Sequence, residues 1–190
     1  MKHRIAKASL CNVLSLALIL AGCSTSWISA VLADLPVITQ VALNIASIVA
    51  AADGSQVNRA AAAQVQSIAN QVKSDLTLVQ NLITSYQSAT AAERPSIVQK
   101  IDAALSDAQS NLNAILTAVH VDNAALQATI VAAVGVAVST VASIKSLLPA
   151  SASAATARAS NPVKPPSAKQ LKKQFNAIFL ANGFPQAQLK

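Results

Sequence analysis

Apolar residues return every three or four positions through long stretches of this chain. The most regular series is Val98, Ile101, Leu105, Ala108, Leu112, Ile115 and Val119. Residues at this spacing lie along one side of an α-helix, and that side must be buried against other helices. Similar series occur over residues 35–49 and 65–86. The pattern predicts an all-α fold, an antiparallel helical bundle of about four helices over residues 27–148.

The ends of the first two helices are predicted from residues that commonly start or stop a helix. We expect the first helix to begin with Asp34 as its N-cap and Pro36 in its first turn, and to end at Gly54. A short helical stretch over residues 28–33 is an option before it. The second helix is expected to run from near residue 55 to about residue 92.

The third helix has two candidate starts, each with the residue types of a capping box. Ser96 precedes Gln99 by three residues, and Thr90 precedes Glu93 by the same interval. Both options stay open on the sequence. The fourth helix is expected to begin at Asp122, because an aspartate suits the N-cap position.

The fourth helix differs from the others because it has no polar side. Residues 123–144 contain no charged side chain, and apolar residues occur on every side of the helix. Such a helix lies either in the centre of a bundle or in lipid. Gly135, Ser139 and Ser143 follow one another at intervals of four, and they would let another helix approach closely in either setting.

The composition changes after residue 148. Residues 27–148 carry five basic and seven acidic residues, whereas residues 149–190 carry six basic residues and no acid. Residues 149–167 are rich in alanine, serine and proline, so we expect a flexible linker there. Residues 168–190 are expected to form a short, basic amphipathic helix and tail, with Gly183 ending the helix.

The expected C-terminal helix separates apolar from basic side chains. Its apolar side holds Leu171, Phe175, Ile178 and Phe179, and the lysines that lie largely away from it are Lys169, Lys172 and Lys173. Three uses of this helix are consistent with the pattern. Its apolar side can pack on the bundle, the helix can bind an anionic membrane surface or cell-wall polymer, or it can occupy the groove of a partner envelope protein.

Residues 1–22 have the features of a secretory signal peptide. Lys2, Arg4 and Lys7 supply a positive N-terminal region without any acid. The apolar run that follows, over residues 13–20, is too short to span a bilayer by itself. An ordinary signal peptide or an uncleaved anchor would share these features.

The end of that apolar run resembles the lipobox of bacterial lipoproteins, with Leu20, Ala21, Gly22 and Cys23 at the four motif positions. The resemblance implies that a signal peptidase recognises the first three and cuts before Cys23, whose thiol carries a diacylglycerol. Residues 23–26 would form a lipidated tether. In this family an aspartate after the cysteine often retains the protein in the inner membrane, so Ser24 implies the outer membrane of the cell envelope, facing the periplasm.

Few side chains that support catalysis remain after such processing. Cys11 leaves with the signal peptide, Cys23 is lipidated, and His120 is the one histidine left, at the end of the third helix. No zinc-ligand spacing, phosphate-binding loop or nucleophile motif occurs. We therefore expect no enzyme, no metal and no cofactor beyond the covalent lipid, and neither nucleic acid nor a small-molecule substrate as a partner.

Two functions follow as expectations. The favoured one is a non-catalytic lipoprotein that serves as a structural or interaction module of the bacterial cell envelope, with Trp27 at the membrane interface. The alternative is an integral or pore-associated membrane protein, with spanning helices near residues 35–52 and 123–144. The polar sides of the second and third helices favour the first.

Overall fold

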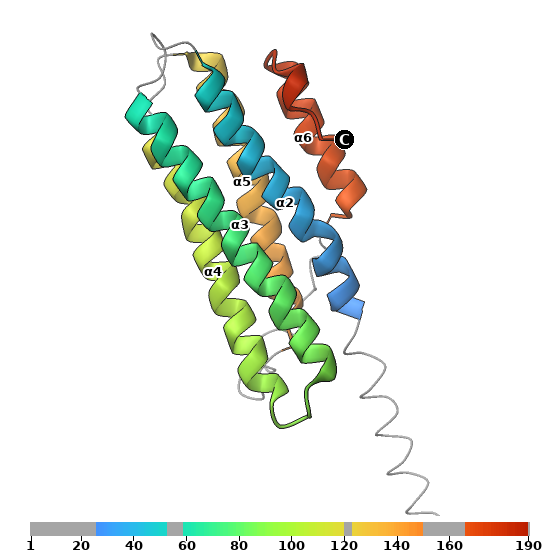
Figure 1. Ribbon diagram of the computed structural model, residues 1–190. Coiled ribbons are helices and arrows are strands. Elements are labelled where there is room, and N and C mark those ends of the chain that lie inside the picture. The colour runs from blue at the N-terminus through green and yellow to red at the C-terminus, as the bar shows by residue number, and fades with distance from the viewer. Residues whose placement is uncertain (1–25, 53–58, 120–122, 150–165, 190) are drawn as a thin grey trace, which may run out of the picture.

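The computed structural model describes residues 26–52, 59–119, 123–149 and 166–189, which form a bundle of helices (Figure 1). Its elements are α2 (Ser26–Ala51), α3 (Arg59–Ser88), α4 (Arg94–Ala118), α5 (Ala124–Leu147), α6 (Ala168–Ala181) and the short 3₁₀-helix η1 (Pro185–Ala187). α2 to α5 run alternately up and down, and α6 lies beside α2 and α5, parallel to α2 (Figure 1). The described residues contain no strand. The predicted all-α bundle of about four helices with a short C-terminal helix is confirmed.

Successive helices make the main contacts of the bundle, and α3 with α4 is the most extensive pair. The core is built from aliphatic side chains of every helix, such as Ile45, Val72, Leu112 and Val134, which are inaccessible to solvent. Buried alanines lie between them, and their small side chains let neighbouring helices approach closely. These alanines are Ala42, Ala46, Ala69, Ala104, Ala108, Ala133 and Ala137.

The start of α2 differs from the prediction. α2 begins at Ser26, so Asp34 is not an N-cap and Pro36 lies inside the helix. Proline in a helix interior costs about 3 kcal/mol because it removes a backbone N–H donor. Continuing the helix buries Trp27, Ile28 and other apolar side chains, each worth about 1.5–3 kcal/mol. This burial outweighs the local preference for a helix start near the proline.

Neither candidate start of the third helix is its N-cap, although Thr90 and Glu93 interact in the turn between α3 and α4. The side-chain carboxylate of Glu93 accepts hydrogen bonds from the backbone N–H of Thr90 (2.9 Å) and from its hydroxyl (2.8 Å). These bonds lower the pKa of Glu93, the backbone bond being the larger cause. The helix begins at Arg94, directly after Glu93. Ser96 lies within the first turn, so its predicted capping role is wrong.

α5 begins one residue after the predicted position and has two different sides. Asn123 is the N-cap, and its side-chain oxygen accepts a hydrogen bond from the N–H of Leu126 at 3.0 Å, whereas Asp122 lies outside the described residues. One side of α5 is buried, but Gly135 is exposed and has no atom within 4 Å of the place a Cβ would occupy. The close helix approach expected at Gly135 is therefore absent from the described part of the chain.

Two helices are long and apolar enough to cross a membrane by length and composition alone. They are Trp27–Ala51 and Ala124–Leu147, with mean hydropathy of 1.6 and 1.9. In this fold, 50% and 44% of their most apolar windows are buried inside the bundle. The core helices of a soluble bundle meet the same criterion, so these two helices alone do not distinguish the two environments.

Candidate functional site

The residues of the lipobox, Leu20 to Cys23, lie outside the described part of the chain. The described part begins at Ser26, which was expected to belong to the tether and is instead the first residue of α2. Only Ser24 and Thr25 separate Cys23 from this helix. A chain extends by at most about 3.6 Å per residue, so the Cα atom of Cys23, to which any lipid would be attached through the side chain, lies within about 11 Å of the start of α2.

Trp27 lies inside the bundle rather than on its surface. Its side chain is 5% exposed and meets the ring of Tyr86 edge-on, with 5.5 Å between the ring centroids. Arg94, on α4, adds a third helix to this contact. Its guanidinium carbon lies 5.3 Å from the centroid of the same Tyr86 ring. The expectation that Trp27 contacts the membrane is therefore corrected. Its ring joins the start of α2 to the end of α3.

The apolar side of α6 packs on the bundle. Leu171, Phe175 and Phe179 are inaccessible to solvent, and Ile178 is half-buried. α6 contacts both α2 and α5, so these side chains fill the groove between the two helices. Of the three uses predicted for this apolar side, the structure shows the first, packing on the bundle. The same residues are thus unavailable for a membrane or a partner.

The residues after α6 fold back and attach the C-terminal segment to two helices. Asn176 on α6 both donates to the carbonyl of Leu189 (3.1 Å) and accepts from its N–H (2.7 Å). Asn44 on α2 donates to the carbonyl of Ala187 at 2.8 Å. Gly183, with a φ of 82°, permits the turn that starts this return. Neither asparagine was predictable from the sequence, because an asparagine on a helix carries no pattern that indicates its long-range partner.

The lysines of α6 remain on its outer surface. Lys169 and Lys173 are exposed, and Lys172 is half-buried. They lie in the first two turns of the helix, after a capping box in which Ser167 accepts from the N–H of Gln170. Of the residues predicted to contact a membrane or a partner, these lysines and the half-buried Ile178 are the ones that solvent can reach.

Asp34 was expected at a helix end and is a buried acid instead. Its side chain is 2% exposed in the middle of α2. Burial raises the pKa of Asp34 to about 6, because removal from water disfavours the charged form. The signal that could have indicated this is its position seven residues after Trp27, on the same side of the helix.

A second acid, Asp75 on α3, links two helices. Asn111 on α4 donates a hydrogen bond to its carboxylate at 2.8 Å. Burial raises the pKa of Asp75, the bond from Asn111 opposes this, and the charge of Asp107 adds to the rise. The arrangement joins α3 to α4 and has the character of a structural contact.

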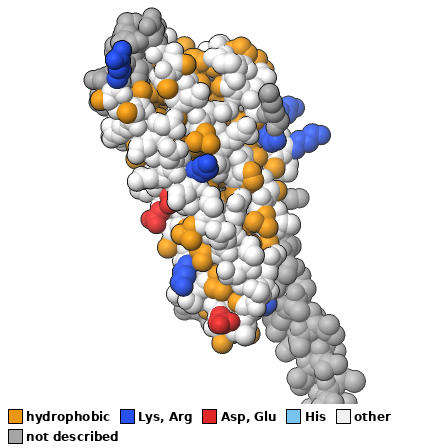
Figure 2. All heavy atoms as spheres, viewed as in Figure 1, with side chains coloured by type: hydrophobic (Ala, Val, Ile, Leu, Met, Phe, Trp, Pro, Cys, Tyr) orange, Lys and Arg blue, Asp and Glu red, His pale blue; other side chains and the backbone are white. Residues whose placement is uncertain are grey.

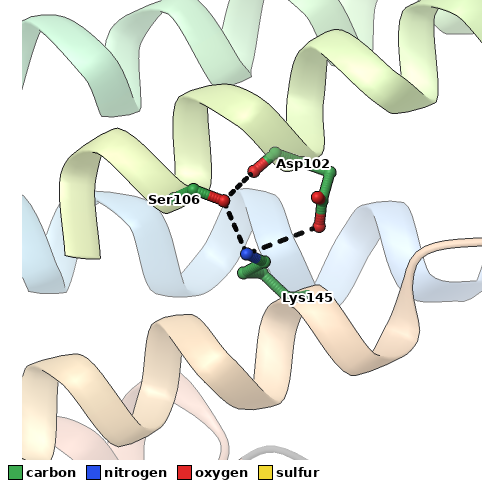
Figure 3. Close-up of polar contacts among 3 residues, drawn as sticks. All are labelled: Asp102, Ser106 and Lys145. Carbon is green, nitrogen blue, oxygen red and sulfur yellow. Dashed lines mark hydrogen bonds and ion pairs between the residues drawn. The ribbon is translucent and has the colours of Figure 1, made fainter. Parts of the chain in front are cut away.

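A serine and a lysine meet between α4 and α5, as Figure 3 shows. The ammonium of Lys145 on α5 donates to Ser106 Oγ at 2.6 Å and lies 3.6 Å from a carboxylate oxygen of Asp102. Ser106 donates its own proton to the backbone carbonyl of Asp102, at 2.8 Å. A catalytic serine needs a neighbour that accepts its proton, but the ion-paired ammonium is a donor. The cluster therefore acts as a polar link between two helices.

The described residues offer little for holding a ligand. No group of three or more His, Cys, Asp and Glu side chains that could hold a metal ion occurs among them, and His120 lies outside them. A hollow beside Ile48, Leu126 and Phe184 has a volume of about 120 Å³. A larger hollow of about 500 Å³ is open to solvent and is lined by residues of α3 alone, so no second helix encloses it. Pockets for small molecules usually measure about 300–1,000 Å³.

Comparisons of the chain with known proteins find no match among family models, curated proteins or solved structures.

Proposed function

We propose that this protein is a non-catalytic lipoprotein of the bacterial cell envelope, anchored through lipid on Cys23 and serving as a structural or interaction module. The observation that carries the proposal is the run Leu20-Ala21-Gly22-Cys23, which resembles a lipobox and ends three residues before α2 begins. A diacylglycerol with a further acyl chain holds a protein on a bilayer almost permanently, since each buried methylene contributes about 0.8 kcal/mol.

The shape of the described part is consistent with a module that acts through its outer surface. The apolar sides of all five α-helices are used within the fold, and the polar clusters join helices to one another. A short connection from Cys23 keeps this bundle beside the membrane surface. We propose the outer membrane as the site of anchoring, facing the periplasm, because Ser24 follows the cysteine.

The anchor is tested by replacing each cysteine in turn and following the protein in its own host. With the natural sequence, we expect a membrane-bound chain whose N-terminal peptide has the mass of a lipidated cysteine. Cys23→Ser should abolish the lipid mass and leave residues 1–22 uncleaved. Cys11→Ser is the matched control and should change neither result. An unmodified thiol at Cys23 in the mature chain would refute the anchor.

The second candidate, an integral or pore-associated membrane protein, is favoured by one observation. α2 and α5 are long and apolar enough to span a bilayer. Alkaline carbonate extraction distinguishes the two proposals once lipidation is removed. In a Cys23→Ser chain exported through an ordinary cleavable signal peptide, a lipoprotein body is released by carbonate, whereas spanning helices stay in the membrane pellet.

A further inference from the structure

Charged side chains are divided unequally between the two sides of the bundle. The solvent-accessible acids of the described residues belong to α3, to α4 or to the turn before α4, and they are Asp75, Glu93, Asp102 and Asp107. Asp34 on α2 is buried, and α5 and α6 contain no acid. Asp53 and Asp122 lie outside the described residues. Within the described part, the side formed by α2, α6 and α5 exposes no acid.

The lysines of α6 give that side an excess of positive charge (Figure 2), whereas the basic residues of α3 and α4 lie among acids. Lys169 and Lys173 are exposed one turn apart on the outer ridge of the helix. They lie near the N-terminus of α6, where the partial positive charge of the helix end disfavours a cation. Their position therefore weakens the helix slightly, and an anionic partner would compensate for both charges.

The surface around these lysines is uncharged and partly apolar. Leu180 lies on the same ridge of α6, seven residues after Lys173, and is 55% exposed. α2 exposes only uncharged side chains, and the one charged residue of α5, Lys145, is paired with Asp102 on α4. Lysines beside exposed apolar residues are typical of protein surfaces that lie at the level of lipid headgroups.

We propose that the outer ridge of α6, formed by Lys169, Lys173 and Leu180, lies against the anionic phospholipid headgroups of the membrane that carries the anchor. The proposal rests on the proposed function for the anchor but uses a different part of the chain. α6 is parallel to α2, and its N-terminal half, with the lysines, points toward the end of the bundle where α2 begins (Figure 1). The side formed by α3 and α4, which carries the described solvent-accessible acids together with an equal number of basic residues, then faces away from the bilayer.

A bilayer suits this ridge better than a folded protein partner. Protein interfaces usually depend on a few aromatic or arginine side chains that fill pockets of the partner. The two phenylalanines of α6, Phe175 and Phe179, are already buried in the bundle. What the ridge offers is long, mobile cationic side chains on a convex surface, which can follow headgroups that have no fixed arrangement.

Chemical protection of lysines tests the proposal on the natural full chain as purified from its host. The protein is mixed with phosphatidylcholine vesicles, with or without about one third phosphatidylglycerol, and acetylated briefly before mass spectrometry. We expect acetylation of Lys169 and Lys173 to fall about fivefold when phosphatidylglycerol is present, in line with the attraction of one lysine to an anionic surface. Lys73 and Lys100, exposed on α3 and α4, are internal controls and should react equally in both vesicles.

High salt and a soluble polyanion distinguish binding to lipid headgroups from binding to an acidic polymer or protein. About 1 M salt should abolish the protection, since it shortens the screening length to about 3 Å. Equal acetylation of Lys169 and Lys173 in both vesicles would overturn the proposal. So would protection by soluble polyglutamate in the absence of protection by phosphatidylglycerol, because that result assigns the ridge to an acidic polymer or protein. The mass of the peptide containing Cys23, read in the same experiment, reports separately on the anchor.

Matched charge variants provide a second measurement. Ala177→Cys places a thiol on the exposed side of α6 for a polarity-sensitive dye. The emission should shift to the blue with phosphatidylglycerol vesicles, and this shift should disappear in a Lys169→Gln, Lys173→Gln background. A Lys73→Gln, Lys100→Gln background removes the same charge from the other side and should keep the shift. Loss of the shift in both backgrounds would mean that net charge alone matters and would refute the assigned ridge.

Discussion

Replacing Asp34 with asparagine should stabilise the bundle, and the gain should grow with pH. Asp34 is 2% exposed, and burial raises its pKa to about 6 from an ordinary value of 3.8. Asparagine has nearly the same shape but no charge to desolvate. The substitution therefore removes the cost of burying a carboxylate and leaves the packing of α2 nearly intact.

The size and sign of the effect follow from the two pKa values. Well below pH 3.8 the carboxyl is protonated in both the folded and the unfolded chain, so its ionisation costs no stability. As the pH rises, the unfolded chain ionises first, and folding then requires either proton uptake or burial of the charge. At about 1.4 kcal/mol per pKa unit, the penalty grows from about 0.6 kcal/mol at pH 4 to about 3 kcal/mol at pH 7.

Guanidinium unfolding followed by circular dichroism measures this effect at several pH values. On residues 24–190, Asp34→Asn should raise the free energy of unfolding by about 2–3 kcal/mol at pH 7 and by less than about 1 kcal/mol at pH 4. Asp107→Asn, on the exposed side of α4, serves as the control and should show a much smaller trend, because it removes only a minor influence on the pKa of Asp75. A gain that does not change with pH, or a loss at pH 7, would refute the buried-carboxylate argument.

Three further substitutions test the packing around α6 and the link to α5. Phe175→Ala should lower the free energy of unfolding by about 3–5 kcal/mol, because the ring is fully buried, and a loss below about 1 kcal/mol would show that α6 is not docked in solution. Gly183→Ala should cost about 1–2 kcal/mol in the same assay, from the positive φ alone, since no atom lies within 4 Å of the added Cβ. Lys145→Met should change the free energy of unfolding by at most about 1 kcal/mol, and this difference from the natural chain should disappear at high salt. A large loss that does not depend on salt would contradict a half-exposed ion pair.

Helix type and approximate position were predictable from the sequence because the signals are local. The series from Val98 to Val119 marks one side of α4, and Thr90 with Glu93 marks the turn before it. Both depend on residues three or four positions apart. The start of α2 was not predictable in this way, because Asp34 and Pro36 have the local features of a helix start. The burial of Trp27 against Tyr86, far away in the sequence, overrides those features.

The candidate site was likewise predictable only in part from the sequence. The sequence shows that one side of the C-terminal helix, with Phe175 and Phe179, must be covered, but the same pattern serves docking, lipid binding and partner binding. Periodicity identifies the apolar side of a helix without identifying what covers it. The lysines on the opposite side were identified as candidates, and their separation from all described solvent-accessible acids became visible only in the fold.

The amino-acid sequence by itself determined that the chain is helical and which side of each amphipathic helix is apolar. It also contains the motif at Cys23 that predicts a lipid anchor. Only the tertiary structure decided that α6 closes the groove between α2 and α5 and that Asp34 is buried. The physical reason is the range of the interactions. Helix periodicity and capping act within a few residues, whereas burial depends on contacts such as that of Asn44 with Ala187, which are 143 positions apart.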